Sequence, residues 1–136
     1  MNYLLDVNAL VALGFLQHEF HERVARWTYR LASTGAAQLA TCSITELGFV
    51  RVLAQAPYYG FTALQARNML LQLKTSRIIG FEFIPDDHDI SHLPGWVKNA
   101  KQITDGHLAQ LARAKGAVFA TLDMRIPRAF LIPDGK

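Results

Sequence analysis

The sequence predicts an α/β fold in which a mostly parallel sheet lies between two layers of helices. Short apolar segments bounded by turn residues alternate along the chain with longer segments whose apolar residues recur at helical spacing. The short segments are apolar throughout rather than alternating with polar residues, which is typical of strands covered on both faces. These observations favour parallel strands with helices on both sides of the sheet.

The first half of the chain is predicted to contain two strands and four helices. The strands are residues 3–7 and 38–42, and the helices are residues 8–16, 19–31, 43 to about 54, and 62–75. Val24, Trp27 and Leu31 recur at helical spacing and are expected to face the core. On the fourth helix the expected buried side chains are Leu64, Ala66, Leu70 and Leu71. Arg23, Arg26 and Arg30 follow the same period on another side of their helix, so we expect a solvated basic face.

The second half is predicted to contain three strands and one helix. The strands are residues 78–84, 118–122 and 130–132, the last of them at an edge of the sheet, and the helix is residues 104–115. Gly116 ends that helix. Residues 85–94 contain two prolines and several polar residues, so we expect an irregular loop.

Length and composition indicate one globular domain, and we expect it to span residues 1–136. Hydrophobic residues make up 51% of the chain and charged residues 18%, a balance that excludes a disordered protein. Cys42 is the single cysteine and no secretory segment precedes the first apolar run, so a cytoplasmic location is expected. That run, residues 3–16, is too short to span a bilayer and contains Asp6 and Asn8, which argues against a membrane anchor.

Four acidic residues follow strands or begin helices in the predicted fold. Asp6 lies at the end of the first strand, Glu46 in the first turn after the second, Asp105 in the first turn of the last helix, and Asp123 just beyond strand 118–122. In an open parallel sheet these places share the carboxyl edge, where ligands bind. We therefore expect the four carboxylates to converge.

Converging carboxylates repel one another unless cations or helix N-termini compensate their charge. Oxygen ligands suit Mg²⁺ or Mn²⁺, which also bind phosphate oxygens and retain waters that can act as nucleophiles. The net charge of the chain is +3, and with these four acids neutralised it becomes about +7, which suits a polyanion such as nucleic acid. The pattern thus indicates hydrolysis of phosphodiesters.

Each acid also has a purely structural explanation. Glu46 fits a capping box with Ser43, Asp105 would stabilise a helix N-terminus, and Asp6 and Asp123 would accept backbone hydrogen bonds in turns. Capping alone does not require four acids out of eleven to lie at one edge of the sheet. The joint pattern therefore favours a metal site.

The sequence resembles PIN-domain nucleases over nearly its whole length. The resemblance rests on four short motifs in a specific order: LDVN at residues 5–8, TELGFVR at 45–51, ITDGHL at 103–108 and ATLD at 120–123. Within that family the chain is most similar to VapC toxins of bacterial type II toxin–antitoxin pairs. His18, His21 and Trp27, which follow the first helix, add to this similarity.

This resemblance implies a PIN-like three-layer α/β/α sandwich and a Mg²⁺- or Mn²⁺-dependent endoribonuclease. It also implies a homodimer that a cognate VapB antitoxin inhibits by covering the acidic groove. By position, the metal-binding catalytic residues would be Asp6, Glu46, Asp105 and Asp123, supported by Asn8 and Thr121. His107 departs from the family, which commonly has tyrosine there, and this departure puts a local substrate contact in doubt.

Other signals carry less weight. His88 and His92 have the spacing of zinc ligands but lie between prolines and lack the accompanying glutamate, so we discount zinc. Cys42 is expected to be a core thiol. Arg125 and Arg128 follow Asp123 and could contact a phosphate, although solvation is the commoner outcome. Tyr58, Tyr59 and Phe61 flank a turn, and we favour an interface role for them over base stacking.

Two competing functions stay open at this point. A PIN-like module could bind RNA or a protein without cleaving anything, and metal-dependent cleavage that requires Asp6 would separate this possibility from the enzyme. A phosphorelay receiver domain also gathers acids around Mg²⁺ at the carboxyl edge of a parallel sheet. It would need paired acids and a late lysine, whereas this chain has Asn8 in place of the second acid.

Overall fold

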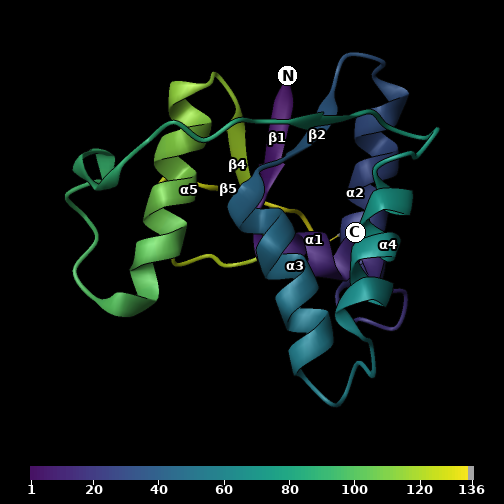
Figure 1. Cartoon of the computed structure of the whole chain (residues 1–136). Helices are drawn as coiled ribbons and strands as arrows, with labels where there is room; N and C mark the ends of the chain where they lie inside the picture. Colours follow the sequence, from purple (N-terminus) through teal and green to yellow (C-terminus); the bar gives the residue numbers. More distant parts are fainter. Residues whose placement is uncertain (135–136) are drawn as a thin grey trace.

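The computed structural model describes residues 1–134 and contains a parallel five-stranded sheet with the strand order β3-β2-β1-β4-β5 (Figure 1). The strands are β1 (Asn2–Leu5), β2 (Gln38–Thr41), β3 (Phe81–Phe83), β4 (Val118–Thr121) and β5 (Phe130–Leu131). Central strand β1 pairs Leu4 with Ala40 of β2 and with Phe119 of β4. Because every pairing is parallel, the carboxyl ends of all the strands lie at one edge, as predicted.

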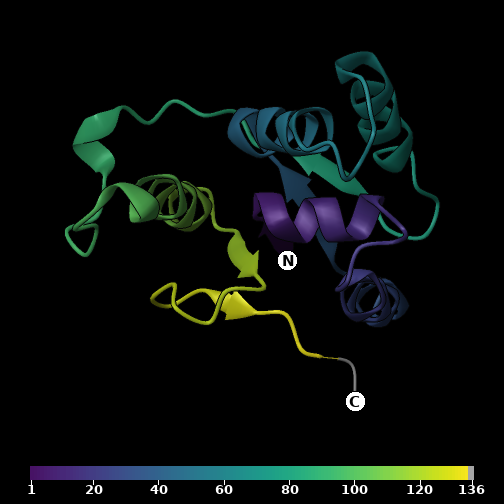
Figure 2. The same ribbon diagram turned by 90° about the horizontal axis from the view of Figure 1, so that it is seen from below.

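The helices are α1 (Val7–Gly14), α2 (His21–Ser33), α3 (Ser43–Gln55), α4 (Ala63–Leu73) and α5 (Ile103–Ala114). Two single 3₁₀ turns, Ile90–His92 and Ala100–Gln102, interrupt the long connection between β3 and α5. Figure 2 shows α5 standing apart from α1 to α4. Within residues 1–134, no helix combines the length and the apolar character needed to cross a membrane.

Two hydrophobic cores lie on opposite faces of the sheet, because successive side chains of a strand point to opposite faces. Leu5 and Leu39 belong to the first core, which α1, α2, α3 and α4 cover. Their neighbours Leu4 and Ala40 belong to the second core, where Leu108 and other side chains of α5 pack. The three-layer α/β/α architecture predicted from the sequence is confirmed.

The predicted elements all exist, but several boundaries differ. The first strand ends at Leu5 rather than at residue 7, because Asp6 caps α1 and Val7 is already helical. The strand predicted at residues 78–84 pairs only over Phe81–Phe83, although Ile79 and Ile84 beside it are buried. Apolar composition therefore identified buried residues more accurately than it identified strand pairing.

The predicted capping box of Ser43 and Glu46 is wrong. The N-cap of α3 is Cys42, whose main-chain N–H donates to Thr45 Oγ1 at 2.9 Å, and Ser43 is the first helical residue. Since strand β2 ends at Thr41, one residue earlier than predicted, the helix also begins earlier than the capping motif suggests. Glu46 is thereby free to take other partners.

Three expectations about side-chain exposure also need correction. Leu64 and Leu71 are exposed on α4, where Ala66 and Leu70 form the buried stripe. Arg23 is not merely solvated, because its Nε donates at 2.9 Å to the carbonyl of Ile132 and ties α2 to the segment after β5. Of the aromatic residues near the turn, Tyr59 and Phe61 pack edge-to-face on Phe15 and against the first core, whereas Tyr58 is exposed.

Helices α1 and α3 approach closely at Gly48. A Cβ atom at this position would lie only 2.5 Å from Cγ2 of Val7 and 3.1 Å from its Cγ1. Valine is stiff about χ1, so its side chain has little freedom to move aside. The close approach therefore requires glycine, and it fixes Val7, the residue next to Asp6.

We expect Gly48→Ala to lower the free energy of unfolding by about 1 kcal/mol, because an overlap costing roughly 1–3 kcal/mol outweighs the better helix propensity of alanine. Urea unfolding followed by circular dichroism measures the change. Gly95→Ala is the matched control, since a Cβ there meets no atom within 4 Å. Equal stability of the two variants would contradict the close helix contact.

Candidate metal centre at the carboxyl edge of the sheet

Asp6 lies at the junction of β1, β4 and α1, with its side chain almost completely buried. Its Oδ1 accepts a hydrogen bond from the main-chain N–H of Ala9 at 2.8 Å, which caps α1. Its own main-chain N–H donates to the carbonyl of Ala120 at 3.1 Å, continuing the β1–β4 pairing. The carboxylate is therefore fixed by a strand on one side and a helix on the other.

Thr121 links two of the predicted acids. Its hydroxyl donates to Asp6 Oδ2 at 2.5 Å, and its Oγ1 accepts from the main-chain N–H of Asp123 at 3.0 Å. Thr121 is the last residue of β4 and is fully buried, so its rotamer is well defined. The structure therefore places this threonine directly against the acidic residue that it was predicted to support.

Asp105, in the first turn of α5, and Asp123, just beyond β4, lie near enough to Asp6 for their charges to raise its pKa. Burial raises the pKa of Asp105, and the negative charge of Asp123 raises it further. Hydrogen bonds from Arg125 lower the pKa of Asp123: the main-chain N–H and Nε donate to Oδ1 at 2.9 and 3.0 Å, and Nη2 donates to Oδ2 at 3.0 Å. Arg125 thus balances the charge of Asp123.

The electrostatic cost of placing several carboxylates at one partly buried edge is clearest at Asp6. Its pKa rises from 3.8 to about 6, first because burial disfavours the charged form and then because Asp105 and Asp123 repel it. The hydrogen bonds from Thr121 and Ala9 act in the opposite direction but do not cancel the rise. The three acids predicted from sequence to share one edge therefore do influence one another in the fold.

Glu46 is not brought into this group. Its Oε2 accepts from the hydroxyl of Thr41 at 2.6 Å and from Lys74 Nζ at 2.5 Å, so an ion pair with the end of α4 holds it. The expected convergence of all four carboxylates is therefore not what the structure has. Sequence reasoning missed Lys74, because no local pattern connects residues 28 positions apart.

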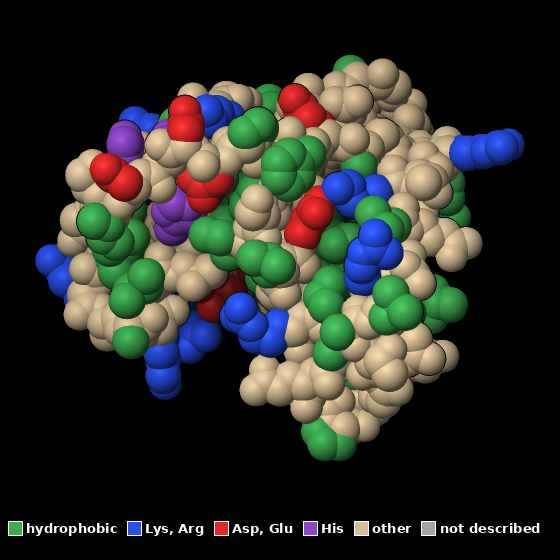
Figure 3. Space-filling view, in the orientation of Figure 1, with side chains coloured by type: hydrophobic (Ala, Val, Ile, Leu, Met, Phe, Trp, Pro, Cys, Tyr) green, Lys and Arg blue, Asp and Glu red, His purple; other side chains and the backbone are tan. Residues whose placement is uncertain are grey.

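A polar cavity of about 430 Å³ opens beside the acids. Asp123 and Arg125 line it together with Asn8, His18, Glu19 and Phe20. Asn8 is exposed on the first turn of α1 and so lies in the wall of the cavity rather than beneath the acids. Figure 3 shows acidic atoms recessed between the surface of α5 and that of α3, with Lys and Arg atoms beside them.

The structure also defines the surroundings of the three histidines, of Cys42 and of Arg128. His107 Nε2 lies 2.5 Å from Asp86 Oδ2, so this histidine connects α5 to the loop after β3. The rings of His88 and His92 stack with centroids 4.2 Å apart, an arrangement for packing rather than for a shared ion. Cys42 is fully buried, as expected for a core thiol. Arg128 is exposed and has a positive φ of 60°.

The donor chemistry of the acidic group fits a hard divalent cation. Asp6, Asp105 and Asp123 offer only oxygen ligands, and a cation would offset both the burial and the mutual repulsion that raise the pKa of the first two. Residues 1–134 nevertheless contain no group of three or more His, Cys, Asp or Glu side chains already gathered closely enough to hold a metal ion. Binding would require Asp123 to exchange at least part of its contact with Arg125.

Comparison with known sequences gives consistent results. The chain is 37% identical over 127 residues to ribonuclease VapC38 of Mycobacterium tuberculosis, which covers 88% of this chain and 84% of that protein. It is 37% identical over 125 residues to ribonuclease VapC29, covering 90% and 86%, and 33% identical over 129 residues to ribonuclease VapC39, covering 90% and 89%, both of the same organism. No family model matches the chain.

Comparison with solved structures supports the same fold. VapBC2 from Rickettsia felis, crystallised with a DNA fragment from its promoter, contains a chain that superposes with a TM-score of 0.64 at 19% identity, covering 96% of this chain and 97% of that one. VapC20 of M. tuberculosis, a toxin that cleaves the sarcin–ricin loop, superposes with a TM-score of 0.54 at 11% identity, covering 90% and 88%.

The sheet order, the helices on both faces and the acids beyond β1 and β4 define the class of protein as a PIN-domain fold. Several VapC ribonucleases are more than 30% identical to this chain over most of their length, which identifies the family within this class. The chain belongs to the VapC ribonuclease family. The resemblance stated from sequence alone is confirmed.

The raised pKa of Asp6 predicts a pH-dependent stability. The folded protein therefore binds a proton at the carboxylate of Asp6 more tightly than the unfolded chain does. The contribution of Asp6 to the free energy of unfolding is therefore greatest below about pH 4, falls as the pH rises to about 6, and is constant above that. In the presence of a chelator, Asp6→Asn should remove this decline and raise the free energy of unfolding at pH 7 by about 1–2 kcal/mol.

Urea titrations between pH 4 and 8 measure this effect. An asparagine side chain keeps an oxygen for the N–H of Ala9, and its amide can donate to Thr121, so the fold should persist. Glu22→Gln is the control, because Glu22 is an exposed acid on α2. If Asp6→Asn were less stable than the parent at pH 7, the electrostatic argument would be wrong.

Proposed function

We propose that this protein is an endoribonuclease that uses Mg²⁺ or Mn²⁺ to hydrolyse RNA phosphodiester bonds, and that it acts as the toxin of a type II toxin–antitoxin pair. The observation that carries the proposal is the coupled group Asp6, Asp105 and Asp123 at the carboxyl edge of a VapC-family fold. Its RNA substrate and divalent metal would meet at that edge. Such a role also agrees with a cytoplasmic location.

The carboxylates of Asp6, Asp105 and Asp123 would hold the metal, and Glu46 is the fourth acid of the proposed catalytic set. When bound, Mg²⁺ or Mn²⁺ supplies a water of lowered pKa and an electrophile for the phosphate oxygens. The N–H of Ala9 and the hydroxyl of Thr121 hold both oxygens of Asp6, so this ligand is oriented in advance. Glu46 would contribute only after leaving Lys74.

Other side chains around the acids would position the RNA strand. Arg125 already balances the charge of Asp123 and stands at the cavity mouth, where it could transfer to a phosphate oxygen of the substrate. Asn8 lines the same cavity and would donate hydrogen bonds to the strand. Thr121 would act indirectly, by fixing Asp6 and the main chain of Asp123 together.

Cleavage of labelled total RNA by the purified protein tests the enzyme. We expect discrete fragments with 5′-phosphate ends in Mg²⁺ or Mn²⁺, no cleavage with a chelator, and a loss of roughly 100-fold or more in Asp6→Asn. The mutant, purified identically, controls for contaminating nuclease. Ends carrying a 2′,3′-cyclic phosphate would exclude attack by water, and inactivity of a folded, metal-bound sample would favour a binding module.

We further propose that the protein is inhibited by a VapB-type antitoxin and forms a homodimer. Exposed apolar side chains on α3 and α4 support association with other chains, because Leu47 is 63% exposed and Leu71 is 47% exposed beside a groove of about 360 Å³. Phe83, at the end of β3, adjoins the same groove. An antitoxin segment over the acidic edge would block access to Asp6 and Asp105.

Light scattering after size exclusion tests the dimer. The expected mass is twice the chain mass of 15.2 kDa. Leu71→Glu should shift the protein towards the monomer, because a charge in an apolar interface is costly to desolvate. Leu16→Glu changes an even more exposed leucine, which lies between α1 and α2, and should leave the mass unchanged. A monomeric parent protein at micromolar concentration would contradict the proposal.

A further inference from the structure

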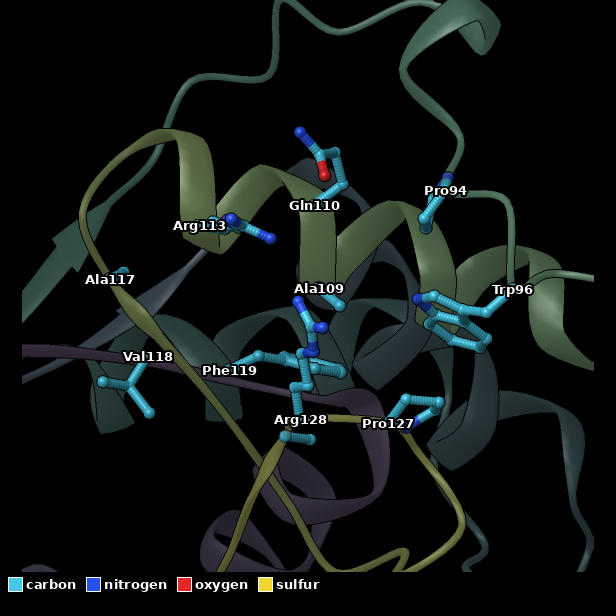
Figure 4. Close-up of a pocket in the computed structure, with 11 residues that line it drawn as sticks. Pro94, Trp96, Ala109, Gln110, Arg113, Ala117, Val118, Phe119, Pro127 and Arg128 are labelled. Carbon is cyan, nitrogen blue, oxygen red and sulfur yellow. The ribbon is translucent and has the colours of Figure 1, made fainter.

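A cavity of about 760 Å³ has none of the acidic residues in its lining. It lies between α5 and the segment that connects β4 to β5 (Figure 4). Its apolar surface comes from Trp96, Ala109, Phe119 and Pro127. Strand β5 pairs only with Ala120 and Thr121, so the first half of β4 remains open to this groove.

Two arginines stand in this groove without an opposite charge. Figure 4 shows the side chains of Arg113, from α5, and Arg128, from the β4–β5 connection, reaching toward the same part of the cavity. The lining of the groove contains no Asp or Glu. Within residues 1–134 neither guanidinium belongs to any of the salt bridges or side-chain hydrogen bonds, whereas Arg23 and Arg125 both have partners. Because both guanidinium groups lack an acidic partner, the groove favours an anionic ligand.

The backbone of Arg128 is strained. It is the one non-glycine residue with a positive φ within residues 1–134, at 60°. This conformation is disfavoured for a residue with a Cβ. A glycine would adopt it freely, so the arginine side chain stands at a position where the backbone disfavours it.

Trp96 forms the opposite end of the groove from Arg113. Figure 4 shows its indole beside Pro94 and above Pro127, with one part of the ring facing the cavity. The side chain is only half-buried. Aromatic faces of this kind stack on unpaired bases in single-strand binding proteins. A flat, apolar group next to an anion therefore matches the groove.

Helix α5 leads from the acidic edge to the groove. Asp105, Ala109 and Arg113 are spaced four residues apart and so lie on one side of that helix, about 12 Å from first to last at 1.5 Å per residue. On the other side of the groove, the connection between β4 and β5 leads from Asp123 to Arg128. A strand held at the carboxylates could therefore continue into the groove.

We propose that this groove binds one nucleotide of an unpaired RNA strand, with a phosphate between Arg113 and Arg128 and a base on Trp96. The identity of RNA as the natural ligand rests on the proposed function, whereas the anionic and planar character of the ligand rests on the groove itself. The subsite would hold the strand outside the bond that is cut. It would therefore raise affinity and select unpaired RNA.

Fluorescence anisotropy of a 5′-fluorescein octauridylate tests this proposal. All proteins carry Asp6→Asn and all samples contain chelator, so that binding is measured without cleavage. Arg113→Gln combined with Arg128→Gly removes both charges and relieves the strain at position 128. We expect this pair to weaken binding at least tenfold and to reduce the slope of log affinity against log salt by about 1–2. Trp96→Ala should weaken binding about tenfold, and Trp96→Phe much less.

The control is Arg26→Gln combined with Arg30→Gln, which removes the same charge from the exposed face of α2. Circular dichroism establishes that every variant is folded. Affinity and salt slope of the groove variant within twofold of this control would overturn the proposal, as would tight, groove-dependent binding of an oligoglutamate in preference to RNA.

Failure of the subsite and failure of the ribonuclease are distinguishable. If RNA is cleaved but the groove variants bind the oligonucleotide like the parent, only the subsite is wrong. If no RNA is cleaved but the groove variants lose binding, the subsite stands and the enzyme assignment fails. With active protein, the groove variants should raise KM more than they lower kcat, because they do not touch the reacting phosphate.

Discussion

The junction between β1 and β4 is the constraint on which the site depends. Asp6 continues the sheet through its main-chain N–H, caps α1 through one carboxylate oxygen, and accepts the hydroxyl of Thr121 through the other. These contacts hold a buried acid in a place where its charge is disfavoured. Asp105 comes to the same edge on the first turn of α5, which packs on the second core, and Asp123 comes there just beyond the end of β4.

The alternation of strands and helices was sufficient to predict the architecture, because a strand covered on both faces requires apolar residues at every position. It also predicted the positions of Asp6, Asp105 and Asp123, since each follows or begins an element that a parallel sheet directs to one edge. Boundaries were less predictable. The ends of β1 and β2 depend on capping by Asp6 and Cys42, and a cysteine is not a residue from which a cap is usually inferred.

The side-chain environment of Glu46 could not be predicted, because it depends on how α4 folds back against α3. Lys74 reaches Glu46 from the end of α4, and the hydroxyl of Thr41 binds the same oxygen. Similarly, Arg23 looked like part of a solvated ridge until the position of the chain after β5 was known. In both cases the missing information is tertiary: a long polar side chain finds a partner that sequence spacing does not indicate.

The contact of Arg23 with Ile132 also protects the sheet. Strand β5 is only two residues long and stands at the edge, where a longer open strand would serve as a template for strands of other molecules. Arg23 anchors the chain directly after β5 to α2 and so keeps this short strand paired beside the end of β4. An arginine of α2 thus protects the sheet against edge-to-edge aggregation.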